Sequence, residues 1–210
     1  MRLASPLYAI LDTGVATRFG WTVPRLAQAY LEGGARLLQI RAKDLTSAAY
    51  LALCEEVSRQ ARAHAAQVII NDRADIAVLV EASGVHVGQD DLPAHAARRL
   101  VGDARIVGLS THTMAQVEAA VQEPVSYIAV GPVFPTGSKD TGYAPVGPEL
   151  VREAVARAGD RPVVGIGGIT LERAVSIIEA GAAAVAVISD LLTEGDPGAR
   201  VRAFLAALEP

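Results

Sequence analysis

The sequence predicts a single (β/α)8 barrel, the TIM-barrel fold, and three observations support this prediction. Short apolar runs rich in β-branched residues alternate with longer amphipathic or alanine-rich stretches, which is the pattern of a parallel sheet covered by helices. Each kind of segment occurs eight times, and eight strand–helix units close such a sheet into a barrel. The chain is 51% hydrophobic but only 4% aromatic, so Val, Ile, Leu and Ala must fill the core, as in a sheet buried on both faces.

The expected strands are short, and each is followed by Gly or a polar residue. In order, they are 7–11, 37–40, 68–70, 85–87, 106–109, 127–130, 163–166 and 184–188. The expected helices are 23–32, 47–64, 75–82, 94–100, 114–121, 148–158, 171–180 and 198–208. Pro148 and Pro197 stand where the first turn of a helix accepts proline, and Gly33, Gly34 and Gly181 stand where helices end.

A doubly wound open sheet is the alternative fold. That fold normally carries a glycine-rich phosphate loop after its first strand, whereas Leu11-Asp12-Thr13-Gly14 follows the first strand here. The glycine-rich turn comes after the seventh strand instead, which favours the barrel. No linker or low-complexity segment divides the chain, so we expect one catalytic domain over residues 1–210.

Composition also restricts the partners. The formal net charge of −4 and the pI near 5.6 argue against nucleic acid or an anionic membrane, so an anionic substrate needs local basic groups or a metal. The single cysteine, Cys54, excludes an intramolecular disulfide, and its apolar neighbours predict a buried side chain. The N-terminus lacks a signal-like apolar run and no stretch approaches ~20 apolar residues, so we expect a cytoplasmic protein. The sequence leaves open whether it forms a homo-oligomer.

Chemically notable residues follow strands two, three and four, at the barrel end where such folds place their sites. Gln39, Arg41 and Lys43 alternate along the second strand and its end, so they share a face. Two adjacent cations repel unless they share an anion, and a diphosphate suits a guanidinium beside an ammonium. The alternative is a solvated strand end paired with Asp44.

Two aspartates follow the next strands. Asp72 and Asp91 come from adjacent strands, so both can approach one point, and Mg²⁺ prefers one or two carboxylates with phosphate and water completing its shell. For either aspartate alone, capping a helix is the simpler interpretation. Together with the basic pair they predict a magnesium–diphosphate site.

The later strands carry groups that suit a second anion. Ser110 and His112 follow strand five and could bind substrate or cap a helix, but nothing marks Ser110 as an activated nucleophile. Loop 132–146 is long for this fold, which is typical of a lid, although a flexible surface turn is the alternative. Gly167 and Gly168 follow strand seven, where backbone N–H groups at a helix start bind phosphate. Two anion sites in one mouth favour group transfer over isomerisation.

Seven segments together resemble the thiamine-phosphate synthase family, also called thiamine-phosphate pyrophosphorylases. They are QIRAK, VIINDR, GVHVGQDD, VGLSTHT, AVGPVFPTGSKDTGYAPVG, VGIGGIT and VAVIS, and they occur in the family's order and spacing over residues 7–192. The GVHVGQDD and GPVFPTGSK segments are specific, whereas VGIGGI-like turns recur across phosphate-binding barrels.

The resemblance implies which residues bind which ligand. Asp72 and Asp91 would bind Mg²⁺. The pyrimidine diphosphate would be held by Gln39, Arg41, Lys43, Asn71, His86, Ser110 and Lys139, of which Arg41, Lys43, Ser110 and Lys139 would be catalytic. The thiazole phosphate would be held by Thr136, Gly137, Ser138, Gly167, Gly168, Ile188 and Ser189.

The implied reaction is a transfer that yields thiamine phosphate. Pyrophosphate leaves, a pyrimidinyl-methyl cation forms, and the thiazole nitrogen captures it. No general base or nucleophile is required, because the task is to stabilise charge on the departing pyrophosphate. Water would intercept the cation, which gives loop 132–146 a reason to close.

Two residues depart from the family pattern. Ser138 stands where members commonly carry Thr, a change that keeps the hydroxyl. Asp190 follows Ser189 where a small residue is usual. A carboxylate beside a phosphate site is unfavourable unless it points away or caps a helix, so Asp190 puts the affinity for thiazole phosphate in doubt.

Three other functions are alternatives to the synthase, and each predicts different residues at the barrel mouth. Thiazole tautomerases resemble the same family but lack the two aspartates with the second-strand lysine, which this chain has in Lys43, Asp72 and Asp91. A non-catalytic barrel that binds phosphorylated metabolites would have no use for such a charge cluster. A metal-dependent sugar-phosphate epimerase would need paired His and Asp ligands on several strands, whereas only His86 and His112 reach the expected mouth.

Overall fold

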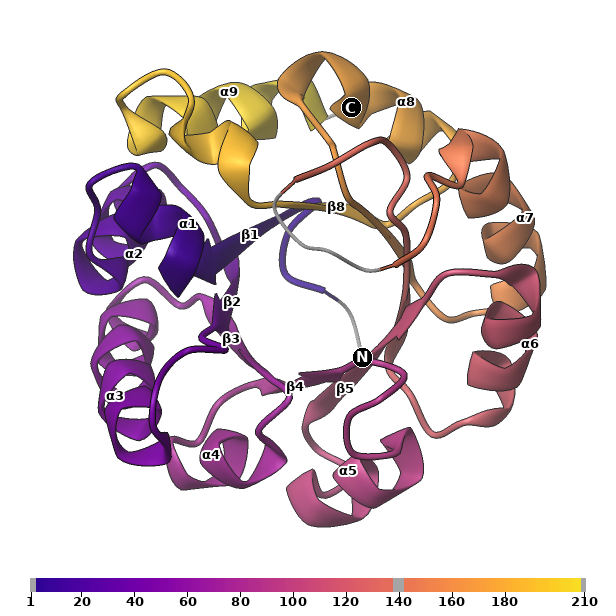
Figure 1. Ribbon diagram of the computed structural model, residues 1–210, viewed down its shortest axis with the longest axis horizontal. Helices are drawn as coiled ribbons and strands as arrows, with labels where there is room; N and C mark the ends of the chain where they lie inside the picture. The colour runs from indigo at the N-terminus through magenta and orange to yellow at the C-terminus, as the bar shows by residue number, and fades with distance from the viewer. Residues whose placement is uncertain (1–2, 138–141, 209–210) are drawn as a thin grey trace.

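The computed structural model describes residues 3–137 and 142–208, and it contains a closed barrel of parallel strands (Figure 1). Neighbouring strands pair in sequence order, and β8 pairs with β1 to close the ring. The strands are β1 Leu7–Asp12, β2 Leu37–Arg41, β3 Gln67–Asn71, β4 Gly84–Val87, β5 Ile106–Thr111, β6 Tyr127–Val130, β7 Val163–Ile166 and β8 Ala184–Val187. The expected barrel is confirmed, with small differences at strand ends.

The helices form a ring outside the strands (Figure 1). Those the sequence predicted are α2 Val23–Glu32, α3 Ser47–Ala63, α4 Ala74–Leu79, α5 Ala94–Val101, α6 Met114–Gln122, α7 Gly147–Ala158, α8 Leu171–Glu179 and α9 Pro197–Leu208. Cys54 is buried within α3, as expected, and burial raises the pKa of its thiol to about 12. The side chain is therefore part of the core.

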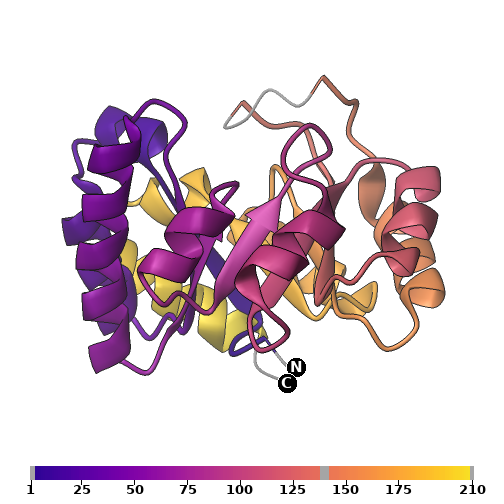
Figure 2. The same ribbon diagram turned by 90° about the horizontal axis from the view of Figure 1, so that it is seen from below.

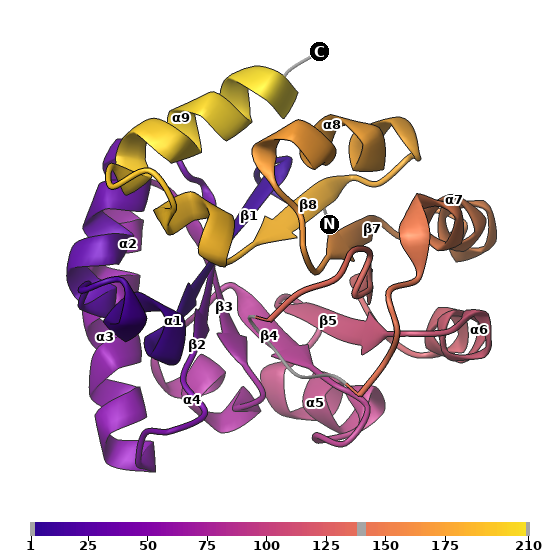
Figure 3. The ribbon, with the colours of Figure 1, turned by 45° about the horizontal axis from the view of Figure 1, so that its top comes forward.

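Two short helices were not predicted. Helix α1, Thr13–Arg18, follows β1, and the 3-10 helix η1, Ser189–Leu192, follows β8. Both follow the carboxyl ends of neighbouring strands, and α1 and the turn after β8 lie close to the barrel mouth in Figure 3. They add side chains to the mouth that the alternation of strands and long helices did not indicate.

Alternate residues of each strand belong to two separate cores. In β1, Leu7, Ala9 and Leu11 pack among the helices, whereas Tyr8 and Ile10 belong to the cluster inside the barrel. The same alternation places Gln39 and Arg41 on the inner side of β2, because Leu37 is an interior residue. The inner face at the carboxyl end of β2 is therefore polar, whereas Ile166, Ala186 and Ile188 keep the ends of β7 and β8 apolar.

The carboxyl ends of the strands and the described parts of the connection from β6 to α7, residues 131–137 and 142–146, lie on one face of the barrel (Figure 2). The ends of the described chain lie on the opposite face (Figure 2). The polar ends of β2 to β5 thus share one face with the glycine-rich turns after β6 and β7. Within residues 3–137 and 142–208, no helix combines the length and the apolar character needed to cross a bilayer.

Candidate active site

A cavity of about 650 Å³ opens at the carboxyl end of the barrel. Segments that follow β1, β5, β6, β7 and β8 line it. Its lining is Arg18, Phe19, Ser110, His112, Gly131, Pro132, Pro135, Thr136, Gly137, Ile166, Gly167, Gly168, Ile169, Thr170, Arg173, Ala186, Val187, Ile188, Ser189, Asp190 and Thr193. This volume suits a small heterocyclic ligand with a polar tail.

The cavity is lined by the described residues that the sequence assigned to the thiazole phosphate, namely Thr136, Gly137, Gly167, Gly168, Ile188 and Ser189. Gly168 packs so tightly that an added Cβ would meet the Pro135 carbonyl oxygen at 2.4 Å, and its φ is +63°. Only glycine fits this position without a shift of the neighbouring backbone. Ser138 and Lys139 lie outside the described residues.

The cations and carboxylates of β2 to β4 meet on the other side of the mouth. Lys43 forms an ion pair with Asp72, and its Nζ lies 3.8 Å from Oδ1 of Asp91. Burial raises the pKa of the Asp72 carboxyl, the adjacent Asp91 raises it further, and Lys43 lowers it. Asp91 Oδ2 also accepts a 2.9 Å hydrogen bond from the Gly88 N–H. The two carboxylates thus approach one point, where they face the Lys43 ammonium, and their role as magnesium ligands stays a prediction.

Arg41 does not pair with Asp44, the partner expected if the end of β2 were simply solvated. It forms an ion pair with Asp12 at the end of β1. The other Asp12 oxygen accepts a 2.9 Å hydrogen bond from the Val15 N–H and so caps α1. Asp44, the alternative partner, instead accepts a 2.6 Å hydrogen bond from the Thr13 hydroxyl. The pairing of Arg41 or Lys43 with Asp44 is therefore wrong.

The remaining polar residues of the predicted site lie deeper in the barrel. Gln39 donates through Nε2 to the Tyr8 hydroxyl at 2.7 Å, and the hydroxyls of Tyr8 and Tyr127 are 3.1 Å apart. The Tyr127 hydroxyl lies 2.8 Å from His86 Nδ1, and His86 Nε2 lies 2.8 Å from Ser110 Oγ. All five residues are buried, and Ser110 reaches the cavity. Hydrogen bonds therefore connect β2 with β5 through the interior.

Asn71 is buried at the end of β3, next to Asp72 in the chain. Its carbonyl oxygen accepts a 3.2 Å hydrogen bond from the Tyr50 hydroxyl, which also donates to the Ile40 carbonyl at 2.7 Å. Helix α3 thus ties together the ends of β2 and β3, the two strands that carry Arg41 and Asp72.

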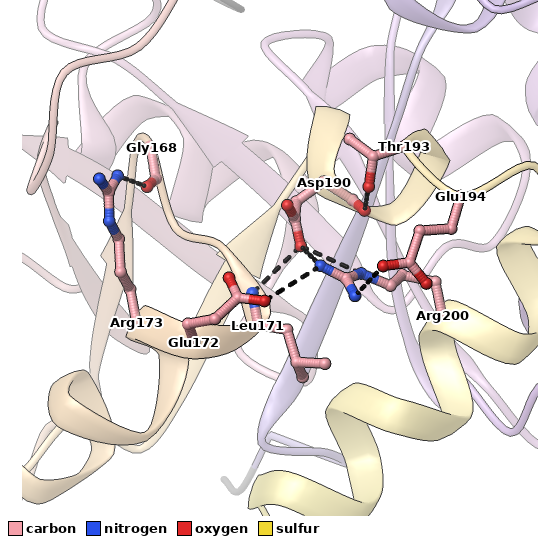
Figure 4. Close-up of polar contacts among 8 residues, drawn as sticks. All are labelled: Gly168, Leu171, Glu172, Arg173, Asp190, Thr193, Glu194 and Arg200. Atoms are coloured by element: carbon pink, nitrogen blue, oxygen red, sulfur yellow. Dashed lines mark hydrogen bonds and ion pairs between the residues drawn. The ribbon is translucent and has the colours of Figure 1, made fainter.

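Asp190 lies beside the cavity, but its carboxylate forms an ion pair with Arg200 of α9 (Figure 4). Its Oδ2 is 2.8 Å from Nη2 of Arg200 in α9, and it accepts a 3.1 Å hydrogen bond from the Leu171 N–H at the start of α8. The side chains of Asp190 and Arg200 are only 12% and 8% exposed, so this pair is shielded from solvent. The doubt that Asp190 raised about phosphate affinity is thereby reduced.

Several lining residues were missed by the sequence reasoning. Arg18 and Phe19 come from the end of α1, and Arg173 comes from the first turns of α8. Arg173 donates to the Gly168 carbonyl at 2.9 Å and stacks over the Phe134 ring, 4.8 Å from its centroid (Figure 4 shows the first contact). An arginine just after a Gly-Gly turn is a signal that could have indicated Arg173, whereas Arg18 required knowledge of α1.

Comparisons with known proteins agree on one family. The family described as thiamine monophosphate synthase matches residues 7–191. A thiamine-phosphate synthase of Roseiflexus castenholzii is 45% identical over 179 residues, which are 85% of this chain and 78% of that protein. The bifunctional thiamine biosynthesis protein ThiM/ThiE of Symbiobacterium thermophilum is 45% identical over 97% of this chain, which spans 42% of that longer protein.

A solved structure gives the same result. The thiamine phosphate pyrophosphorylase from Pyrococcus furiosus superposes with a TM-score of 0.87 at 25% identity, over 97% of this chain and 95% of that one. The shared fold therefore extends over nearly the whole length of both chains.

Proposed function

The chain belongs to the thiamine monophosphate synthase family, and we propose that its barrel mouth joins 4-amino-2-methyl-5-(diphosphooxymethyl)pyrimidine to thiazole phosphate, giving thiamine phosphate and pyrophosphate. One observation carries this proposal. A cation–carboxylate cluster of Lys43, Asp72 and Asp91 and a glycine-lined cavity meet in one mouth, with Ser110 at the cavity wall. The cluster suits a metal-bound diphosphate, and the cavity suits a small phosphorylated ring.

The donor set around Lys43 fits Mg²⁺. Asp72 and Asp91 come from neighbouring connections and share one ammonium group, so a small divalent cation at the same place would meet two carboxylate oxygens. Burial raises the pKa of Asp72 most, and the adjacent Asp91 raises it further; a cation would relieve the repulsion between the two acids. No group of three or more His, Cys, Asp or Glu suited to a metal occurs within residues 3–137 and 142–208, so substrate oxygens and water would supply the other ligands.

Several residues of the chain would together stabilise the negative charge of the departing diphosphate. Mg²⁺, when bound, would neutralise charge that develops on the diphosphate oxygens. Arg41, held by Asp12, and Lys43 would bind the remaining diphosphate charge. Ser110 would donate a hydrogen bond from the cavity wall. Lys139 would add a further cation, a role that rests on the family resemblance alone.

The bond changes need no acid or base from the protein. The C–O bond between the pyrimidinyl-methyl carbon and the diphosphate breaks, and its electron pair leaves with pyrophosphate. The lone pair of the thiazole nitrogen then forms the new C–N bond to the same carbon. The cavity turns after β6, β7 and β8 would hold the thiazole phosphate so that this nitrogen faces the carbon.

Exclusion of water is the second task of the mouth. The connection after β6 is anchored to β7, because the Val133 N–H donates to the Ile166 carbonyl at 2.8 Å and the Phe134 N–H donates to the Gly167 carbonyl at 3.0 Å. Apolar residues line the cavity, among them Pro132 in this connection and Ile188 after β8. A cation formed there would meet the thiazole before it met bulk water.

The test is pyrophosphate release by purified protein supplied with both substrates and Mg²⁺, beside a control that lacks the thiazole phosphate. We expect release that depends on the thiazole, together with thiamine phosphate. Binding of thiazole phosphate without release would instead support a thiazole tautomerase or a non-catalytic binding barrel. Full activity in EDTA would refute the magnesium site but leave the transfer reaction standing.

A further inference from the structure

A continuous set of buried polar side chains crosses the interior of the barrel from β2 to β5. It runs Gln39, Tyr8, Tyr127, His86, Ser110, with neighbouring polar atoms 2.7 to 3.1 Å apart. Tyr8 and Tyr127 meet edge to face, with ring centroids 6.1 Å apart, and His86 stacks on Tyr127 at 5.6 Å. Neither tyrosine lines the cavity that Ser110 reaches. We refer to these five residues as the interior relay.

The interior relay has two directions in which every contact is one donor facing one acceptor, because each hydroxyl carries a single proton. If the Gln39 NH₂ donates to Tyr8, then Tyr8 donates to Tyr127 and Tyr127 donates to His86 Nδ1. The proton of His86 is then on Nε2 and is donated to Ser110 Oγ. In the opposite direction, the Ser110 hydroxyl donates its proton to His86 Nε2.

The end of the relay at Gln39 selects the first direction. Its Nε2 faces the Tyr8 hydroxyl, and an amide nitrogen can only donate. Tyr8 therefore accepts there. If Tyr127 also donated to it, the buried Tyr8 hydroxyl would accept twice and its own proton would have no acceptor among the described residues, so donation from Tyr8 to Tyr127 is favoured. Ser110 Oγ in turn accepts from His86, and its hydroxyl proton stays available to the cavity that Ser110 lines.

We propose that Tyr8 and Tyr127 are positioning residues for the transfer reaction, because they hold His86 in its Nε2–H tautomer and so leave the Ser110 proton to be donated to the pyrimidine diphosphate. The function of the Ser110 proton rests on the proposed function, whereas the tautomer of His86 does not. Neither tyrosine contacts the substrate in this account, so each acts through Ser110.

Packing around the interior relay holds the two tyrosines in place. Gly108 in β5 leaves the space that the Tyr127 ring occupies, since an added Cβ would lie 2.1 Å from Tyr127 Cζ. Burial raises the pKa of both tyrosine hydroxyls, which keeps them protonated and able to donate. Tyr30 in α2 shows the contrast: its hydroxyl is equally buried but has no hydrogen-bond partner among the described residues. Burial of a tyrosine in this protein therefore does not by itself give its hydroxyl a hydrogen-bond partner.

The first experiment reads the tautomer directly. Long-range ¹H–¹⁵N spectra of ¹⁵N-labelled protein distinguish Nε2–H from Nδ1–H imidazoles, and variants of His64, His95 and His112 assign the His86 signals by elimination. We expect the Nε2–H form in the native protein and a loss of that preference in Tyr127→Phe. Tyr30→Phe removes a hydroxyl from a tyrosine outside the relay, so it should leave the His86 spectrum unchanged. A native Nδ1–H form would reverse the relay and overturn the proposal.

The second experiment reads the consequence for turnover. Losing an oriented hydrogen bond to a charged substrate costs about 10- to 100-fold, so we expect kcat/KM for the pyrimidine diphosphate to fall by that factor in Tyr127→Phe. The KM for thiazole phosphate should not change. Because Tyr127 acts through Ser110, combining Tyr127→Phe with Ser110→Ala should cost no more than Ser110→Ala alone.

The outcomes separate the two proposals. Native protein that makes no thiamine phosphate would refute the proposed function and leave the tautomer result as a structural finding. Native turnover with Tyr127→Phe as active as Tyr30→Phe would refute the relay and leave the proposed function intact. Additive losses in the double variant would show that Tyr127 acts by another route. Thermal unfolding of each variant confirms that the compared proteins are folded.

Discussion

Four carboxylates near the mouth lie beside cations. Asp12 pairs with Arg41, Asp72 and Asp91 share Lys43, and Asp190 pairs with Arg200. These pairs cancel much of the negative charge that an anionic substrate would otherwise meet in a protein of net charge −4. They also fix the cations in place before a substrate arrives, which lowers the entropy lost on binding.

Asp91→Asn tests the role of the shared carboxylates. The amide keeps an oxygen that can accept from the Gly88 N–H but removes the charge that faces Lys43. We expect kcat/KM for the pyrimidine diphosphate to fall by about 100-fold or more, because less cationic charge can be held at the diphosphate. Asp90→Asn makes the same change at the neighbouring, exposed residue and should retain native activity. Equal losses in the two variants would argue against a specific site.

The turn between β7 and α8 shows how one element shapes the cavity. Gly168→Ala would place a Cβ 2.4 Å from the Pro135 carbonyl oxygen and push the connection after β6 outward. We expect the KM for thiazole phosphate to rise by about 10- to 100-fold, since small displacements of a binding element have large effects. Steady-state kinetics with the thiazole varied would measure this change.

Gly159→Ala is the matched control for this turn. Gly159 has nearly the same φ, +62° against +63°, but nothing lies within 4 Å of an added Cβ. Both variants should therefore lose stability from backbone strain, Gly159→Ala by about 1 kcal/mol or more because its ψ of −129° lies outside the left-handed helical region, and only Gly168→Ala should change the KM. A similar rise of KM in both would attribute the effect to strain rather than to the cavity.

The link between η1, α8 and α9 depends on Arg200. Its guanidinium binds Asp190 at 2.8 Å and Glu194 at 2.8 Å, and it is almost fully buried (Figure 4). Arg200→Met would leave Asp190 as an uncompensated buried charge, so we expect the free energy of unfolding to fall by about 3 kcal/mol. Arg157→Met breaks the exposed pair with Glu118 and should cost less than about 1 kcal/mol. Urea unfolding of both variants would show whether burial makes this difference.

The predicted elements succeeded where a strong periodic pattern was present. All eight strands and the eight expected helices carry enough alternation to be located from the sequence. Helix α1 has six residues and η1 has four, and they begin one and two residues after a strand ends, within what the sequence indicated only as the loop that follows the strand. Asp12 was consequently treated as part of a loop that lacked a glycine motif, and its capping of α1 and its pairing with Arg41 went unnoticed.

At the scale of the whole molecule, the strand topology determines which parts of the site could be predicted from the sequence. Residues at strand ends, such as Lys43, Asp72 and Asp91, were predicted to converge because the topology brings neighbouring strands together. The contact between Tyr8 and Tyr127 joins residues 119 positions apart and depends on the stagger of opposite strands across the interior. Local patterns contain no information on such a contact, so the interior relay required the structure.

The barrel also separates the two proposed binding sites, and this separation can be measured. The acidic pair belongs to the connections after β3 and β4, whereas glycine-rich turns after β6, β7 and β8 line the cavity. Removing Mg²⁺ with EDTA should therefore weaken binding of the pyrimidine diphosphate by at least about tenfold, while thiazole phosphate, given alone, should bind as before. Isothermal titration with one substrate at a time would measure both constants, and in Asp91→Asn the addition of Mg²⁺ should no longer strengthen binding of the diphosphate. If EDTA weakened the two ligands equally, the metal would serve the fold or a shared site, and the division of the mouth into two halves would be wrong.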